Sequence, residues 1–145
     1  MVAETGPAGG VNASTIASYV VSPNGTLSPI TTDVPTLANA TCWDVATPEG
    51  RWVYTSNPRS GTVSGFAVST TGALSPLAGT VLGTNPTGSI NLDIAASADS
   101  KFLYTLNSGT GTISIFGINQ DGSLNNLGAA GEFSANAGFN DIAAF

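Results

Sequence analysis

Short runs in which apolar and polar residues alternate cover most of the chain, and turns rich in glycine separate them. Residues 15–21, 52–56 and 62–68 alternate with a period of two, which is typical of half-buried β-strands. The pairs Asn24–Gly25 and Thr71–Gly72 follow two of these runs, and the first pair predicts a two-residue hairpin turn. No helical period lies between the runs, so the pattern predicts an all-β chain.

The pattern of strands and turns repeats. The pattern of residues 51–72 recurs in residues 101–122, and the two stretches align without a gap. Residues 14–30 match residues 61–77, so a third copy is entered halfway. Positions shared by the two longer copies include Tyr54 with Tyr104, Asn57 with Asn107 and Phe66 with Phe116.

A short apolar strand that begins with aspartate completes the repeating unit. It occurs three times, as Asp44-Val45-Ala46, Asp93-Ile94-Ala95 and Asp141-Ile142-Ala143. Each unit of about fifty residues is then four short antiparallel strands joined by tight turns and a longer connection, which is typical of one blade of a β-propeller.

This unit sets the expected domain organisation. Residues 1–10 are predicted to be a tail, and residues 11–145 a single propeller segment with repeats at about 11–50, 51–100 and 101–145. The repeat pattern begins in the third strand of one blade and ends in the first strand of another, which gives about two and three-quarter blades. Propellers close with about four to eight blades, so we expect either a fragment of a longer chain or a homo-oligomer.

The residues between Asp93 and Leu124 carry a family resemblance. The sequence Asp-Ile-Ala, then Lys-Phe-Leu-Tyr-Thr-x-Asn-x-Gly-Thr-Gly-Thr-Ile-Ser-Ile-Phe-x-Ile and Asp-Gly-Ser-Leu, resembles the blade signature of the lactonase-like seven-bladed propellers. That group includes propeller-type 6-phosphogluconolactonases, carboxymuconate-cyclising enzymes and YVTN-repeat surface-layer proteins. The resemblance covers residues 11–145 and implies a parent activity that opens or closes the lactone ring of a sugar-acid-type substrate.

The chain departs from the pattern of the catalytic members at two positions. Some lactonase blades place a His before the apolar pair of the inner strand, where this chain has Asp44, Asp93 and Asp141. Those lactonase blades also place a Glu after the Asn of the second strand, where this chain has Pro58 and Ser108. The chain contains no His, so the segment is not expected to be catalytic alone.

A second hypothesis is therefore a non-catalytic scaffold or binding module, similar to the YVTN surface proteins, that assembles through open blade edges. The missing His favours this alternative for the segment itself. The period of about fifty residues favours the lactonase group, since YVTN surface repeats are shorter.

The repeated aspartates are the first candidate site. Equivalent positions of successive blades lie on one ring around a central channel, so Asp44, Asp93 and Asp141 are expected to approach one another there. Such carboxylates could raise each other's pKa for acid–base chemistry or hold a cation like Ca²⁺. The alternative is that each Asp accepts hydrogen bonds from its own blade's turn. No other cofactor is expected.

Two cations and one aromatic residue complete the candidate binding residues. Arg51 and Lys101 begin equivalent strands and could meet an anionic substrate, or they could pair with Glu49 and Asp99 two residues earlier. Trp43 is a candidate because its counterparts in the other copies are Leu92 and Asn140.

Composition narrows the range of partners. Only 8% of the residues are charged, the net charge is −6, and three residues are basic, which excludes most nucleic-acid binding and argues against an anionic membrane surface. No apolar run reaches the length of a membrane span. The expected partners are a sugar acid or lactone, or a protein.

Cysteine content and the N-terminus bear on localisation. With Cys42 as the one cysteine and no His, zinc is not expected. No signal peptide is evident, although the low-charge composition rich in Ser, Thr, Gly and Asn leans toward a secreted or cell-surface protein.

Overall fold

The computed structural model describes residues 1–7 and 10–145, and these residues form three antiparallel sheets. The first sheet contains β1 (Val2–Glu4), β2 (Thr15–Val21) and β3 (Leu27–Pro35). The second contains β4 (Trp43–Ala46), β5 (Trp52–Asn57), β6 (Thr62–Val68) and β7 (Leu74–Thr84). The third contains β8 (Asn91–Ala96), β9 (Phe102–Asn107), β10 (Thr112–Ile118) and β11 (Leu124–Ala130).

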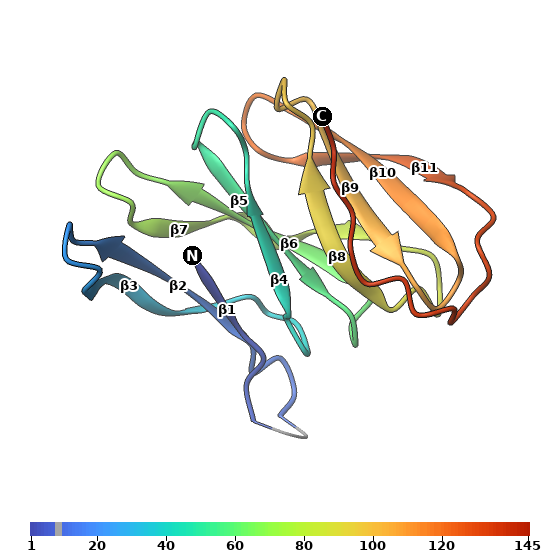
Figure 1. Cartoon of the computed structure of the whole chain (residues 1–145), viewed down its shortest axis with the longest axis horizontal. Coiled ribbons are helices and arrows are strands. Elements are labelled where there is room, and N and C mark those ends of the chain that lie inside the picture. Colours follow the sequence, from blue (N-terminus) through green and yellow to red (C-terminus); the bar gives the residue numbers. More distant parts are fainter. Residues whose placement is uncertain (8–9) are drawn as a thin grey trace.

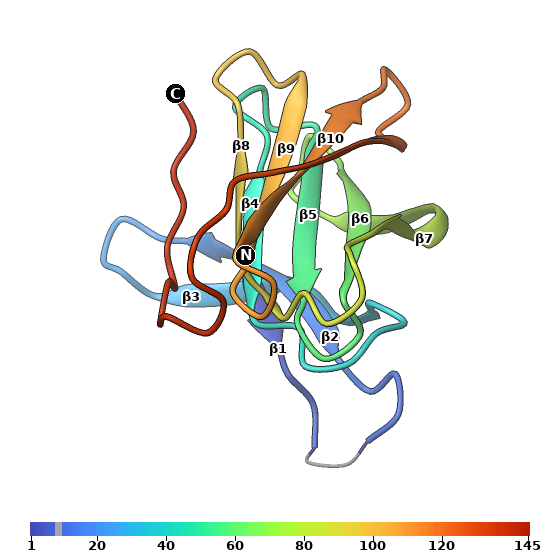
Figure 2. The ribbon, with the colours of Figure 1, turned by 90° about the vertical axis from the view of Figure 1, so that its right-hand side faces the viewer.

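The sheets are propeller blades, as the repeat predicted. Within each sheet the strands pair in sequence order, and the three sheets follow one another across the molecule (Figure 1). The first strands of the two complete blades, β4 and β8, are in contact, and β8 also packs against β5. The view from the side shows β4, β5, β8 and β9 running close together, with the outer strands splayed away (Figure 2).

The predicted tail contains a strand. Val2–Glu4 form β1, which pairs with β2 so that Glu4 lies opposite Thr15. Asn57 of the second blade lies opposite Thr62, the residue that matches Thr15 in the repeat, so β1 is the second strand of the first blade. The Thr15 hydroxyl donates to the Glu4 carboxylate as the Asn57 amide bonds to Thr62.

The last predicted strand is not formed as such. Residues 140–143 make no ladder, although the Ile142 N–H donates to Asp93 Oδ2 at 2.9 Å and so holds this segment beside β8. Figure 1 shows the segment running along β8 and β9. A strand is defined by its ladder, and among the described residues this segment forms a ladder with no other strand. The eleven strands still amount to about two and three-quarter blades. In the described part of the chain, the first blade lacks only its inner strand, whereas the sequence predicted that it lacks its first two strands.

The turn after β2 also differs from the prediction. Gly25 has φ 84°, but Asn24 does not have a positive φ, so the two residues are not a type I′ pair. Instead the Gly25 N–H donates to Ser22 O at 2.8 Å and the Ser22 N–H donates to Thr26 O at 2.9 Å. This pattern is the longer hairpin loop in which a turn is followed by glycine in the left-handed region.

Apolar side chains fill the spaces between successive blades. Between the first and second blades lie Ile16, Val34, Val53, Phe66 and Leu74. Between the second and third lie Tyr54, Val63, Ile94, Leu103 and Phe116. The Tyr54 hydroxyl adds a hydrogen bond of 2.9 Å to Gly122 O across this second contact.

A buried polar network ties the strands of each complete blade together. The Asn57 amide donates to Ser64 Oγ at 2.9 Å, and Asn107 makes the equivalent bond to Ser114 at 2.8 Å. Asn57 Oδ1 additionally accepts from the Thr41 hydroxyl at 2.6 Å. Repetition of these asparagines therefore reflects the satisfaction of buried polar groups inside the blade.

Candidate functional site

Asp93 lies on β8 and is 7% exposed. Its Oδ1 accepts from its neighbour, the Ile94 N–H, at 2.7 Å, and its Oδ2 accepts from the Ile142 N–H. Asp93 thus bonds to one residue of its own strand and to one residue of the C-terminal segment. Among the described residues, no turn of its own blade donates a hydrogen bond to Asp93, which was the alternative considered for the repeated aspartates.

Asp141 lies against Asp93 and is exposed to solvent. Burial raises the pKa of the Asp93 carboxyl, the N–H groups of Ile142 and Ile94 oppose that shift, and the Asp141 carboxyl raises the pKa further. Two carboxyl groups this close can share a proton, and such a pair can take a proton from water or return one.

Asp44 is separate from this pair. Burial raises its pKa, and the N-terminal ammonium and the Ala3 N–H oppose the shift. These influences come from β1 and its N-terminus rather than from the other two aspartates. The structure therefore brings together two of the three aspartates that the repeat placed on one ring.

Trp43 precedes Asp44 on β4 and lies opposite Ser56 of β5. Its side chain is 38% exposed, so an indole face is open at this position. Among the described residues, no three Asp, Glu, Cys or His side chains gather into a group that could hold a metal ion. The three candidate aspartates thus form a pair and a single group, whereas Ca²⁺ takes six to eight oxygen ligands.

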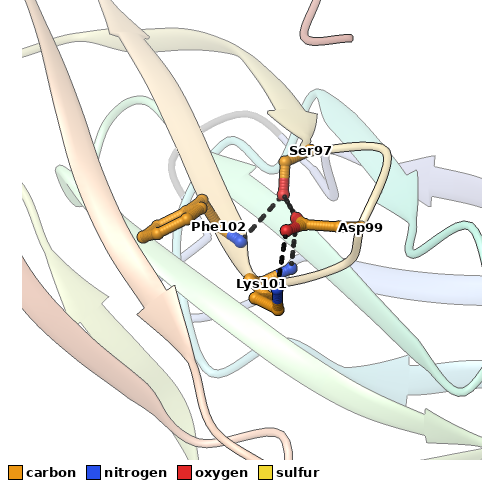
Figure 3. A network of polar contacts seen from close by, with 4 residues as sticks. All are labelled: Ser97, Asp99, Lys101 and Phe102. Atoms are coloured by element: carbon orange, nitrogen blue, oxygen red, sulfur yellow. Dashed lines mark hydrogen bonds and ion pairs between the residues drawn. The ribbon is translucent and has the colours of Figure 1, made fainter.

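Lys101 belongs to a turn network at the other end of the inner strand (Figure 3). Its Nζ lies 3.1 Å from Asp99 Oδ2, and both side chains are largely exposed. Ser97 Oγ donates to Asp99 Oδ1 at 2.7 Å and accepts from the Phe102 N–H at 3.0 Å. The Ser97 hydrogen bond and then Lys101 lower the pKa of Asp99. Lys101 is therefore engaged by the acid two residues earlier.

Arg51 behaves differently from its counterpart. Its guanidinium lies over the Trp52 ring at 4.9 Å from the centroid, and Nη2 donates to Gln120 O at 3.2 Å. No ion pair with Glu49 is formed among the described residues. Arg51 and Lys101 line a groove of about 460 Å³ between the second and third blades.

The two groups of candidates lie at opposite ends of the inner strands. The aspartates are close to where β4 and β8 begin, whereas Arg51 and Lys101 stand before β5 and β9, where the inner strands have ended. The structure therefore does not combine the aspartates and the cations in a single site.

A second groove at the aspartate end was not anticipated. It also measures about 460 Å³ and is lined by Arg59, Asn85 and Ser89, among others. The Ser89 hydroxyl and Asn91 Oδ1 are buried, and neither has a hydrogen-bond partner among the described residues. Arg59 and Asn91 lack equivalents in the other copies, and that difference between copies was the signal in the sequence.

No protein-family model and no curated protein matches the sequence. Solved structures do resemble it. A protein of unknown function from Desulfotomaculum acetoxidans has a TM-score of 0.71 and 19% identity over 85% of this chain and 37% of its own. The periplasmic gluconolactonase of Pseudomonas aeruginosa has a TM-score of 0.67 and 20% identity over 87% of this chain and 37% of its own.

A third neighbour, from Bacteroides fragilis, is a protein proposed to be a 6-phosphogluconolactonase. It has a TM-score of 0.66 and 23% identity, and the match covers 83% of this chain and 34% of the neighbour. The chain thus spans little more than a third of the length of these neighbours, which share its propeller fold. No described part of the chain forms a helix with the length and apolarity to cross a membrane.

Proposed function

We propose that this chain is a segment of a lactonase-like propeller that acts on the lactone of a sugar acid. The observation that carries the proposal is the pair formed by Asp93 and Asp141 at the start of the inner strands. Two named neighbours of the same fold, a gluconolactonase and a proposed 6-phosphogluconolactonase, support the choice of substrate class.

In this proposal Asp141, the exposed member of the pair, is the general base. Its carboxylate takes a proton from a water molecule whose oxygen bonds to the lactone carbonyl carbon. The tetrahedral adduct then collapses, the ring C–O bond breaks, and the ring oxygen receives the proton. Asp93 positions Asp141, because Asp93 Oδ2 accepts from the N–H of Ile142, the next residue along the chain.

A pH-stat assay of glucono-lactone hydrolysis by the 145-residue chain tests this function. The missing His predicted no activity of the segment alone, but a working Asp93–Asp141 pair requires turnover above the spontaneous rate. We expect a loss of about 100-fold or more in Asp141→Asn, which is the usual contribution of a positioned base. Asp121→Asn is the matched control, because Asp121 is an exposed carboxylate bound only to its own turn. Turnover that survives in Asp141→Asn would exclude this carboxylate as the base.

A second candidate is a non-catalytic scaffold or binding module, favoured by the absence of His and by Pro58 and Ser108 at the positions where catalytic relatives are expected to carry Glu. Ser108 is buried, and its hydroxyl donates to Ile90 O at 3.1 Å, which is a structural role. The assay above separates the two functions, since a scaffold gives no turnover with any variant.

A further inference from the structure

The contact between the second and third blades is a template for how one blade covers the next. From the third blade, Ile94, Leu103 and Phe116 pack against Tyr54 and Val63 of the second. All five side chains are buried. The inner strand β8 also contacts both β4 and β5. The third blade therefore packs on the second through its inner strand as well as through its β9 and β10 side chains.

The C-terminal segment reproduces the inner-strand half of this contact on the third blade. Ile142 matches Ile94 in the repeat, and it lines a cleft of about 390 Å³ with Tyr104 and Ile113, which match Tyr54 and Val63. The rest of the contact is missing. Leu127, which matches the partly buried Leu77, is 57% exposed.

The first sheet shows the reverse deficiency. Within the part of the chain that the structure describes, β1 pairs with β2 on one side and with no inner strand on the other. Val21 and Leu27 match Ile118 and Leu124, which pack against the second blade, yet here they are 65% and 58% exposed. The C-terminal segment thus occupies the place of an inner strand whose blade is missing, and the first sheet is a blade whose inner strand is missing.

We propose that a second copy of this chain docks its first sheet on the third blade, so that the C-terminal segment becomes the inner strand of the partner copy's first sheet. The register is taken from the second blade, in which Trp43 pairs with Ser56 and Asp44 with Thr55. The register of the third blade, in which Asp93 lies opposite Leu106, differs from it by one residue. Asn140 then lies opposite Ala3 of the second copy, and Asp141 opposite Val2.

This contact satisfies both open features at once. It supplies ladder partners to the unpaired edge of β1 and to residues 140–143, and it covers the exposed leucines and valine. The contact is head to tail and therefore closes only as a ring. Eleven strands and the C-terminal segment of each chain amount to three blades, and two copies give six, within the range of about four to eight at which propellers close.

Cysteine cross-linking tests the register. In a Cys42→Ser background, Ala3→Cys with Asn140→Cys places two cysteines directly opposite each other across an antiparallel pair, close enough for a disulfide. We expect a covalent species of twice the 14.4 kDa of one chain on a non-reducing gel. The control pair, Ala3→Cys with Gln120→Cys, should stay monomeric. Absence of the cross-link, or a cross-link within one copy, would overturn the proposal.

Light scattering after size exclusion tests the contact without new cysteines. We expect a dimer of the unmodified chain and a dimer dissociation constant roughly ten-fold or more weaker in Leu127→Asp and in Val21→Asp. Both side chains are exposed in one copy, so these variants should fold, and Thr71→Asp is the surface control. A monomer at all concentrations would refute the second copy as occupant and leave these faces to further blades of a longer chain.

Discussion

The two complete blades share one pattern of strands and turns but have unequal surroundings. The blade of β4–β7 is covered on both faces, whereas the blade of β8–β11 is covered on one and meets only the C-terminal segment on the other. Tyr54 is fully buried and bonded to Gly122, while its counterpart Tyr104 is half-buried. Burial at a given position is therefore decided by the neighbouring blade and not by the blade's own strands.

This difference also separates packing residues from candidate functional ones. The positions that recur most faithfully, such as Asn57 and Phe66, are buried inside or between blades. The exposed residues that could contact a ligand, such as Trp43, Arg59 and Asp141, lie where the copies differ or where no neighbouring blade covers the face.

The largest expected effect is at the covered face of the third blade. Phe116→Ala should destabilise the protein by about 3–5 kcal/mol, because a fully buried ring is lost from the contact with the second blade. Phe102→Ala, on the same blade but 37% exposed, should cost about 1 kcal/mol or less in dilute solution. Urea denaturation measures both, and equal costs would contradict the contrast between covered and open faces.

A smaller difference is expected for the buried asparagines. Asn57→Ala should cost about 2–3 kcal/mol and Asn107→Ala about 1–2 kcal/mol, because each removes hydrogen bonds to buried hydroxyls. The gap arises at the carbonyl oxygen, which accepts from Thr41 at 2.6 Å in the second blade and only from Thr105 at 3.5 Å in the third. If thermal or urea unfolding gives the same cost for both variants, the Thr41 bond adds nothing.

The paired tyrosines give a cleaner but weaker comparison. Tyr54→Phe should cost about 0.5–1.5 kcal/mol, because it leaves the buried Gly122 carbonyl without its donor. Tyr104→Phe should be neutral at low protein concentration, since no bond to its hydroxyl is formed among the described residues. A cost for Tyr104→Phe that appears only at high concentration would indicate that another blade has come to lie on this face.

The smallest effect concerns the C-terminal segment and depends on pH. The pKa of Asp93 is raised from 3.8, so the folded chain holds that proton more tightly than the unfolded chain. The resulting stability is present in full below pH 3.8 and is lost as the pH rises through the folded pKa. Relative to the unmodified protein, the free energy of unfolding of Asp93→Asn should therefore be lowest near pH 3.5 and should rise toward pH 7. Urea denaturation across this pH range measures the difference.

Asp121→Asn is the control of opposite sign for this pH series. Hydrogen bonds from Ser123 lower the pKa of Asp121, so its contribution is present above its ordinary pKa and is lost as the pH falls. A stability difference between Asp93→Asn and the unmodified protein that does not change with pH would show that the carboxyl pair is not formed in solution.

The fold was predictable from the sequence because tight turns and alternation repeat at equivalent positions. The four strands of both complete blades follow from the match of residues 51–72 to residues 101–122. β1 was not predictable, because Val2–Glu4 is a three-residue strand whose side chains differ from those of β5 and whose pairing depends on a strand eleven or more residues later. Local pattern carries little information about such a short strand.

The candidate site was predictable only in part. Equivalent placement on inner strands grouped all three aspartates, whereas in the structure Asp141 lies against Asp93 and Asp44 lies apart from both. Sequence spacing suggested Glu49 as the partner of Arg51, but the guanidinium instead reaches Gln120 O, 69 residues away, because the adjacent blade places a turn beside it. Contacts between blades depend on how the sheets pack, and alternation along one strand does not encode that packing.

The outer strands carry a feature that bears on solubility. In all three sheets the register slips between the last two strands, and the extra residues belong to β3, β7 and β11. Such bulges bend and twist an edge so that it is a poor template for a strand from another molecule. β3 and β7 also contain prolines, whereas β11 contains none and is almost wholly exposed. If the chain forms fibrils on long storage, β11 is where stacking would begin, and a proline placed there is the change that would suppress it.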